Sequence, residues 1–95
     1  MDFRVNESKK RFELEVENSI AFIDFILNKD NQIFLTHTEV PQELSGKGVG
    51  KALVAQSLEY IKDKGYTLAP LCPFVAGYVK KNPQWWSILA SGFSV

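Results

Sequence analysis

Cysteine and histidine each occur only once in this chain of 95 residues, and long apolar runs are absent. A single cysteine excludes an internal disulfide, so the fold must depend on its core. The longest mostly apolar stretch, residues 19–27, is far short of the about 20 residues that a membrane-spanning helix needs. No basic and apolar leader precedes the first charged strand. These absences predict a reducing, cytoplasmic setting and no membrane partner.

An excess of charge is also absent, because eleven basic and eleven acidic side chains give a net charge of zero. Such a chain has no long-range field that would attract nucleic acid, so no nucleic-acid partner is expected and any anion must be bound locally. No group of histidine, cysteine and carboxylate residues has the spacing of metal ligands, and we therefore expect no metal.

The first half of the chain has the pattern of strands. Apolar and polar side chains alternate over residues 3–5 and 11–17, as in strands with one solvent-exposed face. Residues 21–27 are nearly all apolar, which predicts a strand covered on both faces. A fourth, central strand is predicted over residues 32–40, and Pro41 ends it because proline lacks a backbone donor.

The second half changes to helical periodicity. Apolar residues recur at a spacing near 3.6 over residues 49–64, and Gly65 stands where a helix end favours a left-handed residue. A short buried strand at residues 66–71 and a helix at residues 74–81 follow. Residues 84–95 are expected to form a short helix and an extended end packed on the sheet.

This order, β-β-β-β-α-β-α with a short C-terminal helix, predicts an α/β sandwich with an antiparallel N-terminal sheet. The strand after the long helix can return parallel to the fourth strand through a right-handed crossover. No repeat or linker interrupts the pattern, so residues 1–95 are predicted to form a single domain.

A glycine-rich turn, residues 45–50, directly precedes the long helix. Glycine at every second position lets the backbone adopt left-handed conformations and allows a ligand to approach closely. The unpaired amides at the helix start and the helix dipole favour an anion there, and Lys47 and Lys51 add positive charge. The turn therefore predicts a phosphate or pyrophosphate site, with ordinary loop chemistry as the alternative.

Two nucleotide motifs are excluded at this turn. A Walker A loop requires glycine where Ser45 stands and a hydroxyl residue where Ala52 stands. A dinucleotide fingerprint requires the spacing G-x-G-x-x-G after the first strand of its unit, whereas this chain has G-x-G-x-G after several strands.

His37 and Cys72 are the side chains best suited to proton transfer and nucleophilic chemistry. His37 alone has an ordinary pKa near neutrality, and its spacing from Ile33 and Leu35 predicts that it shares their face of the strand. Cys72 ends the next predicted strand, so the two side chains are expected to lie within reach of each other. Tyr78, on the following helix, is a candidate proton donor.

Three sequence blocks in this order resemble a known family: HTEVP at residues 37–41, ELSGKGVGKAL at residues 43–53 and LCPFV at residues 71–75. They are similar to the GNAT superfamily of acyl-CoA N-acyltransferases, and in particular to its short, single-domain NATD1-like members. The resemblance covers nearly the whole chain. One position departs from it, because the arginine or glutamine that usually opens the turn is replaced by Ser45.

The resemblance implies that acetyl-CoA, or coenzyme A, binds along the fourth strand and the glycine turn. The pyrophosphate would lie on the turn, and the pantetheine arm would pair with free backbone groups at the end of the fourth strand. The implied cofactor-binding residues, with Tyr78 added from its place on the second helix, are Thr38, Glu39, Val40, Ser45, Gly46, Lys47, Gly48, Val49, Gly50, Lys51 and Tyr78.

The expected function is therefore acetyl-CoA-dependent N-acetyl transfer to an amine acceptor that the sequence does not identify. Two mechanisms stay open: direct transfer with His37 as general base, or an acyl intermediate on Cys72 that His37 activates. The alternatives to an enzyme are a non-catalytic coenzyme A-binding or protein-interaction module and a purely structural domain.

Overall fold

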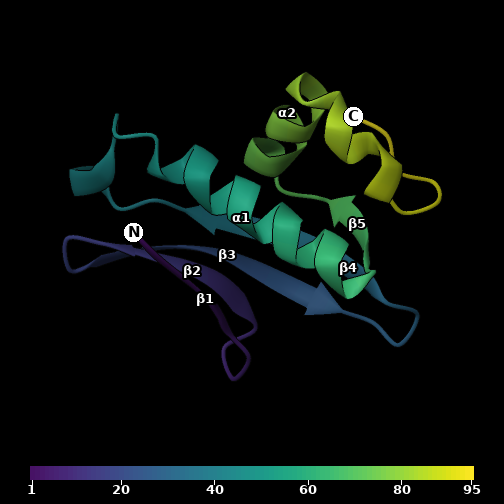
Figure 1. The fold of residues 1–95 in the computed structure, drawn as a ribbon, viewed down its shortest axis with the longest axis horizontal. Coiled ribbons are helices and arrows are strands. Elements are labelled where there is room, and N and C mark those ends of the chain that lie inside the picture. The colour runs from purple at the N-terminus through teal and green to yellow at the C-terminus, as the bar shows by residue number, and fades with distance from the viewer.

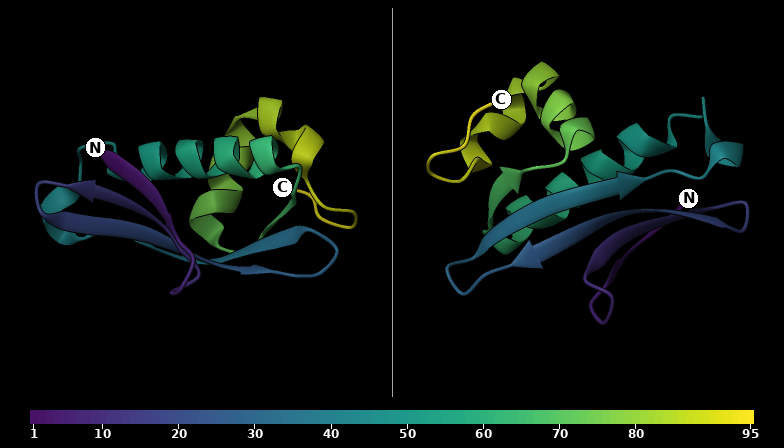
Figure 2. Two further views of the ribbon diagram at one scale, coloured as in Figure 1. Left: turned by 60° about the horizontal axis from the view of Figure 1, so that its bottom comes forward. Right: turned by 180° about the vertical axis from the view of Figure 1, so that it is seen from behind.

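One sheet of five strands carries two helices on the same side (Figures 1 and 2). The computed structural model describes residues 1–95. The strands are β1 (Asp2–Asn6), β2 (Arg11–Val16), β3 (Ser19–Leu27), β4 (Gln32–Glu39) and β5 (Thr67–Pro70). Strands β1 to β4 pair antiparallel in sequence order, and β5 joins β4 in parallel at the edge of the sheet. The helices are α1 (Val49–Lys64) and α2 (Pro73–Lys81), with 3-10 turns η1 (Gln42–Leu44) and η2 (Pro83–Ile88). The predicted order and α/β class are confirmed; η1 was not anticipated.

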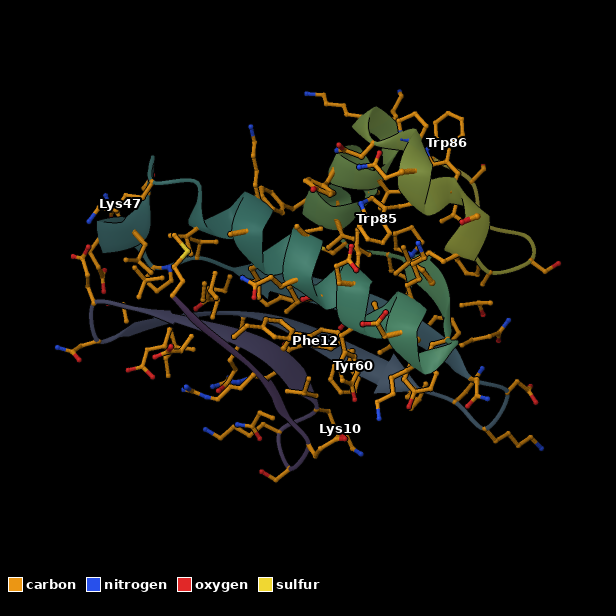
Figure 3. The ribbon with its side chains drawn as sticks, in the orientation of Figure 1. Lys10, Phe12, Lys47, Tyr60, Trp85 and Trp86 are labelled. Carbon is orange, nitrogen blue, oxygen red and sulfur yellow. The ribbon has the colours of Figure 1, made fainter.

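Helix α1 covers the middle of the sheet because one side of it is apolar along its length. Leu53, Leu58 and Ile61 are fully buried beneath it, in a core that continues into β2 and β3. Tyr60 lies edge-on to Phe12 with ring centroids 5.5 Å apart, between the helix and the sheet (Figure 3). Gly65 ends the helix in a left-handed conformation at φ 75°, as expected.

The side of the sheet that faces away from the helices, called the outer face below, carries both polar and apolar side chains and is covered only in part. Strand β3 was expected to be covered on both faces, and this is wrong: its burial alternates, and Ile26 is 60 % exposed. The reason is that both helices pack on one side only (Figure 2), so β3 has one covered face. An apolar run in the sequence does not by itself show whether a strand is covered on one face or on both.

The C-terminal segment closes the free edge of β5. The backbone N–H of Ala90 donates to the carbonyl of Leu68 at 2.7 Å, and Leu89 forms a parallel bridge with Leu68. Phe93 then reaches Phe34 on β4, with ring centroids 6.3 Å apart. The expected short helix and extended end are confirmed, and the last strand gains a partner where its edge would otherwise be exposed.

A buried carboxylate organises the outer face of β1 and β2. Glu13 is 2 % exposed and accepts hydrogen bonds from Arg4 at 2.8 Å, Arg11 at 2.6 Å and Asn6 at 3.0 Å. Burial alone raises the pKa of Glu13, but the hydrogen bonds from Arg11, Asn6 and Arg4 outweigh it and hold the pKa below the usual 4.5. The ionised carboxylate therefore stabilises the fold above about pH 4.5 and loses this contribution as the pH falls through the lower, folded-state pKa.

Glu13→Gln is expected to lower the free energy of unfolding at pH 7 by about 1–2 kcal/mol, a value reduced because the arginines are partly exposed. It should also flatten the loss of stability between about pH 5 and pH 3, since the titrating group is gone. Urea unfolding across this pH range measures both effects. Glu59→Gln, on the exposed side of α1, is the control. If Glu13→Gln leaves the loss of stability at acid pH unchanged, this account is wrong.

Candidate functional site

Strand β4 contains a bulge that reverses which of its side chains face the helices. Phe25 of β3 pairs with Leu35, but the next residue, Asp24, pairs with His37, so Thr36 is an extra residue. Thr38 pairs with Ile23, whose side chain is in the core. The bulge thus places Thr38 on the helix side and turns His37 outward.

The expected face of His37 is therefore wrong. Its imidazole is 57 % exposed and contacts Glu39, with Nε2 and Oε1 3.2 Å apart. It also lies edge-on to Phe22 of the outer face, with ring centroids 6.3 Å apart. Strict alternation would have kept His37 with Ile33 and Leu35, but one inserted residue shifts the period. The predicted proximity of His37 and Cys72 fails for the same reason, because they lie on opposite faces.

Strands β4 and β5 separate after Leu35. Their last paired residues are Leu35 and Pro70, and then the backbone N–H groups of Leu71 and Cys72 both donate to the Leu35 carbonyl, at 3.1 and 2.9 Å. Strand β4 continues to Glu39 without a partner on this side. The result is an opening between the two strands, of the kind predicted at the end of the fourth strand.

Cys72 lies at this opening on the helix side. Its thiol is buried, at 5 % exposure, and the Sγ atom lies 3.1 Å from Oγ1 of Thr38. The residue precedes Pro73, the first residue of α2, and its carbonyl accepts from the amide of Ala76 at 2.9 Å. Thr38 and Cys72 therefore form a pair across the opening, which sequence spacing alone did not indicate.

The glycine turn exposes its backbone directly before α1. Gly46 and Gly48 have φ of 78° and 72°, which side chains disfavour, and α1 begins at Val49. Gly48 caps the helix without a side-chain hydrogen bond, so the first amides of α1 have no partner within the helix. A Cβ atom at Gly46 or Gly48 would meet no heavy atom within 4 Å, so the turn is open to an approaching ligand.

Gly50 is required for a different reason. A Cβ atom there would lie 2.8 Å from the ring of Phe74, at the start of α2. The first turn of α1 therefore approaches α2 closely, and Phe74 forms the wall between two clefts. Phe74 was overlooked as a site residue, although its place directly after Pro73 in the third sequence block was a usable signal.

A cleft of about 410 Å³ lies over the turn, and a second of about 600 Å³ runs along α2. Lys51 and Phe74 line both of them, so the clefts are neighbours. Tyr78 lines only the second, together with Lys81. The first cleft brings together these expected cofactor-binding residues: Val40, Ser45, Gly46, Gly48, Val49, Gly50 and Lys51.

Other expected residues lie outside the first cleft. Lys47 pairs with Glu17 of the β2–β3 turn at 3.2 Å, and Figure 3 places it at the end of the molecule away from Trp85 and Trp86. The Glu39 side chain faces outward beside His37, so only its backbone borders the opening. No three metal-ligating side chains gather in one place, and no helix has the length and apolar character needed to cross a membrane.

Known proteins resemble this chain in sequence and in architecture. A family model described as GCN5-related N-acetyl-transferase matches residues 11–89. The chain therefore belongs to the GCN5-related N-acetyltransferase family, which confirms the resemblance.

Among its relatives is Protein NATD1 of Xenopus tropicalis, 26 % identical over 86 residues, which cover 84 % of this chain and 77 % of that protein. Protein NATD1 of Homo sapiens is 35 % identical over 49 residues, covering 52 % of this chain and 43 % of that protein. The NMR structure of a GCN5-like protein from Staphylococcus aureus has a TM-score of 0.73 at 24 % identity. It covers 98 % of this chain and 90 % of that one, and so shares the fold.

Two helical glycines provide a test of the close contact at Phe74. Gly77→Ala places a methyl group where nothing lies within 4 Å, and should raise the free energy of unfolding by about 0.5–1 kcal/mol through helix propensity. Gly50→Ala should give no such gain, because the methyl group must displace the Phe74 ring. Urea unfolding of both variants gives the comparison. Equal stabilisation by both would contradict the packing described.

Proposed function

We propose that this protein is an acetyl-CoA-dependent N-acyltransferase that transfers an acyl group to an amine. One observation carries the proposal: β4 leaves β5 directly beside a glycine turn that opens a helix, and one cleft joins the turn to the end of β4. An extended thiol ester with a pyrophosphate at its other end fits this arrangement. Family membership supports the acyltransferase class.

The pyrophosphate is assigned to the glycine turn. Free amides at the start of α1 and the positive end of the helix dipole favour an anion there. Lys51 borders the cleft and supplies a positive charge in place of the arginine or glutamine that Ser45 replaces. Lys47 is held by Glu17 through an exposed ion pair, a weak interaction that a phosphate can replace.

The pantetheine arm is assigned to the unpaired edge of β4, residues 38–40. Backbone donors and acceptors there have no partner in β5, and an extended amide-containing chain pairs with them as another strand would. The thioester would then lie near Thr38 and Cys72, where a backbone amide of β4 can polarise its carbonyl. Tyr78, from the neighbouring cleft, is the proposed proton donor to the leaving thiolate.

Direct transfer is favoured over an acyl intermediate on Cys72. The thiol contacts Thr38 Oγ1, a hydroxyl that does not act as a base near neutral pH, and His37 lies on the other face of the sheet. The thiolate is the nucleophilic form of cysteine, and the contact with Thr38 supplies no base to form it. The amine nitrogen would attack the thioester carbon itself, and the carbon–sulfur bond would break to release coenzyme A.

Isothermal titration with coenzyme A tests the cofactor site. The unmodified protein should bind, and Gly48→Ala should weaken binding about tenfold, because its methyl group occupies the face that the phosphates approach. Gly65→Ala is a matched control, since this glycine is also left-handed and open but lies at the far end of α1. Both variants should lose about 1 kcal/mol of stability, and only the first should lose affinity. Absence of binding at high micromolar coenzyme A overturns the proposal.

Cys72→Ala separates the two mechanisms. With direct transfer, the variant should keep acetyl transfer to an amine within about threefold of the unmodified protein, a change typical of a lost packing contact. Mass spectrometry after incubation with acetyl-CoA should show no acetyl adduct on Cys72. An adduct together with transfer abolished in Cys72→Ala would establish the two-step route instead. Binding of coenzyme A without turnover of any amine would show a non-catalytic binding module.

A further inference from the structure

The cleft along α2 is larger than the proposed reaction requires. It has a volume of about 600 Å³ and extends from Phe74, near the start of α2, to Lys81 and Asn82 at its end. At 1.5 Å per helical residue this is a length of about 10 Å. Phe74 and Lys51 also line the cleft over the glycine turn, so a ligand bound at the turn can continue into the cleft along α2. The proposed reaction involves only Tyr78 from this second cleft.

The walls of the cleft along α2 are positively charged and carry no carboxylate. Lys51, on the first turn of α1, and Lys81, on the last turn of α2, both line it, and neither forms an ion pair. No aspartate or glutamate follows Asp63 in the chain, and both Glu59 and Asp63 lie on the last two turns of α1, away from its start. The chain as a whole is neutral, but this part of its surface is positive and favours an anion.

Gly77, in the middle of α2, has no structural role within the protein. Glycine destabilises the interior of a helix relative to alanine. A Cβ atom at this position would meet no heavy atom within 4 Å, and the residue does not have a positive φ, so neither close packing nor a turn requires glycine here. Gly77 lines the cleft, and the missing side chain exposes the helix backbone to a ligand.

The two ends of the cleft face different parts of the proposed ligand. A helical side chain leans toward the N-terminus of its helix, so Tyr78 leans toward Cys72 and the proposed thiol position. Lys81 lies about one turn farther from the opening. Its stem leans the same way, which carries the ammonium group away from the negative end of the helix dipole. The Nδ2 of Asn82 donates to the Tyr78 carbonyl at 2.7 Å and so holds this end of α2 in place.

We infer that the cleft along α2 holds the adenosine 3′-phosphate end of coenzyme A, and that Lys81 makes the protein selective for a donor with this phosphate. The inference rests on the proposed function and names the ligand specificity of the same site. Lys51 is assigned to the pyrophosphate where the clefts meet, Gly77 lets the nucleoside lie against α2, and Lys81 binds the 3′-phosphate. A phosphate monoester has close to two negative charges near neutral pH, so its hydrogen bond from a lysine is charge-assisted.

Coenzyme A and dephospho-coenzyme A, which differ only in the 3′-phosphate, test the selectivity by isothermal titration. The unmodified protein should bind coenzyme A about five- to tenfold more tightly. Lys81→Met removes the charge and keeps an unbranched stem, and should lower this ratio below about twofold by weakening coenzyme A alone. Lys80→Met is the matched control, because Lys80 is the neighbouring exposed lysine of α2 and does not line the cleft. Equal binding of the two ligands by the unmodified protein, or a ratio that Lys81→Met leaves unchanged, overturns the inference.

Lys51→Met and Gly77→Ala test the path between the clefts. Lys51→Met should weaken both ligands by the same factor, about threefold, because both carry the pyrophosphate. Gly77→Ala should weaken coenzyme A about threefold, since its methyl group occupies the surface on which the nucleoside lies. A structural role does not predict a variant that is more stable and binds less tightly. Unchanged affinity in Gly77→Ala, or a ratio that falls in Lys51→Met and not in Lys81→Met, overturns the inference.

Backbone amide shifts separate this inference from the proposed function. In ¹⁵N-labelled protein saturated with either ligand, the two spectra should differ mainly at residues 77–82. Differences centred on Lys47, the lysine within the glycine turn, would place the 3′-phosphate there and overturn the inference while the cofactor site stands. Absence of binding by both ligands would overturn the proposed function and this inference with it.

Discussion

The organisation of the molecule depends on where the pairing of β4 and β5 stops. Over four residues the two strands form an ordinary parallel ladder, and then one carbonyl, that of Leu35, accepts from both Leu71 and Cys72. That shared acceptor ends β5 and turns the chain into α2, while β4 continues alone. Unpaired backbone at this edge must find a partner in water or in a ligand. In a fold this small, the site therefore arises where the sheet is incomplete.

The elements around the opening are held by interactions at a distance from it. Helix α1 is fixed by its buried side, which lets its first turn present free amides. Phe74 sets the spacing between α1 and α2 because Gly50 allows its ring to approach. The β2–β3 turn reaches the glycine turn through Glu17 and Lys47, and Ser19 donates to Glu43 at 2.7 Å. These contacts connect the N-terminal hairpins to the proposed phosphate site.

The two faces of the sheet have different chemistry. The helix side carries the core, the buried thiol and the clefts, whereas the outer side carries a network of arginines and carboxylates with one histidine. Because the helices cover only one side of the sheet, the outer side stays accessible to solvent. Strand β4 contributes side chains to both sides, Thr38 to the helix side and His37 to the outer side.

The sequence by itself determined the order of the elements, the parallel return of β5 and the position of the glycine turn. These features depend on local periodicity, on proline and on glycine, which act within a few residues. The sequence did not determine the direction of His37, because the bulge at Thr36 exists only through pairing with β3, and the run from Ile33 to His37 alternates regularly without it. The contact of Thr38 with Cys72, the wall formed by Phe74 and the open outer face of β3 were also decided only in the tertiary structure. Each joins segments distant along the chain, and long-range packing, not local propensity, selects between the alternatives.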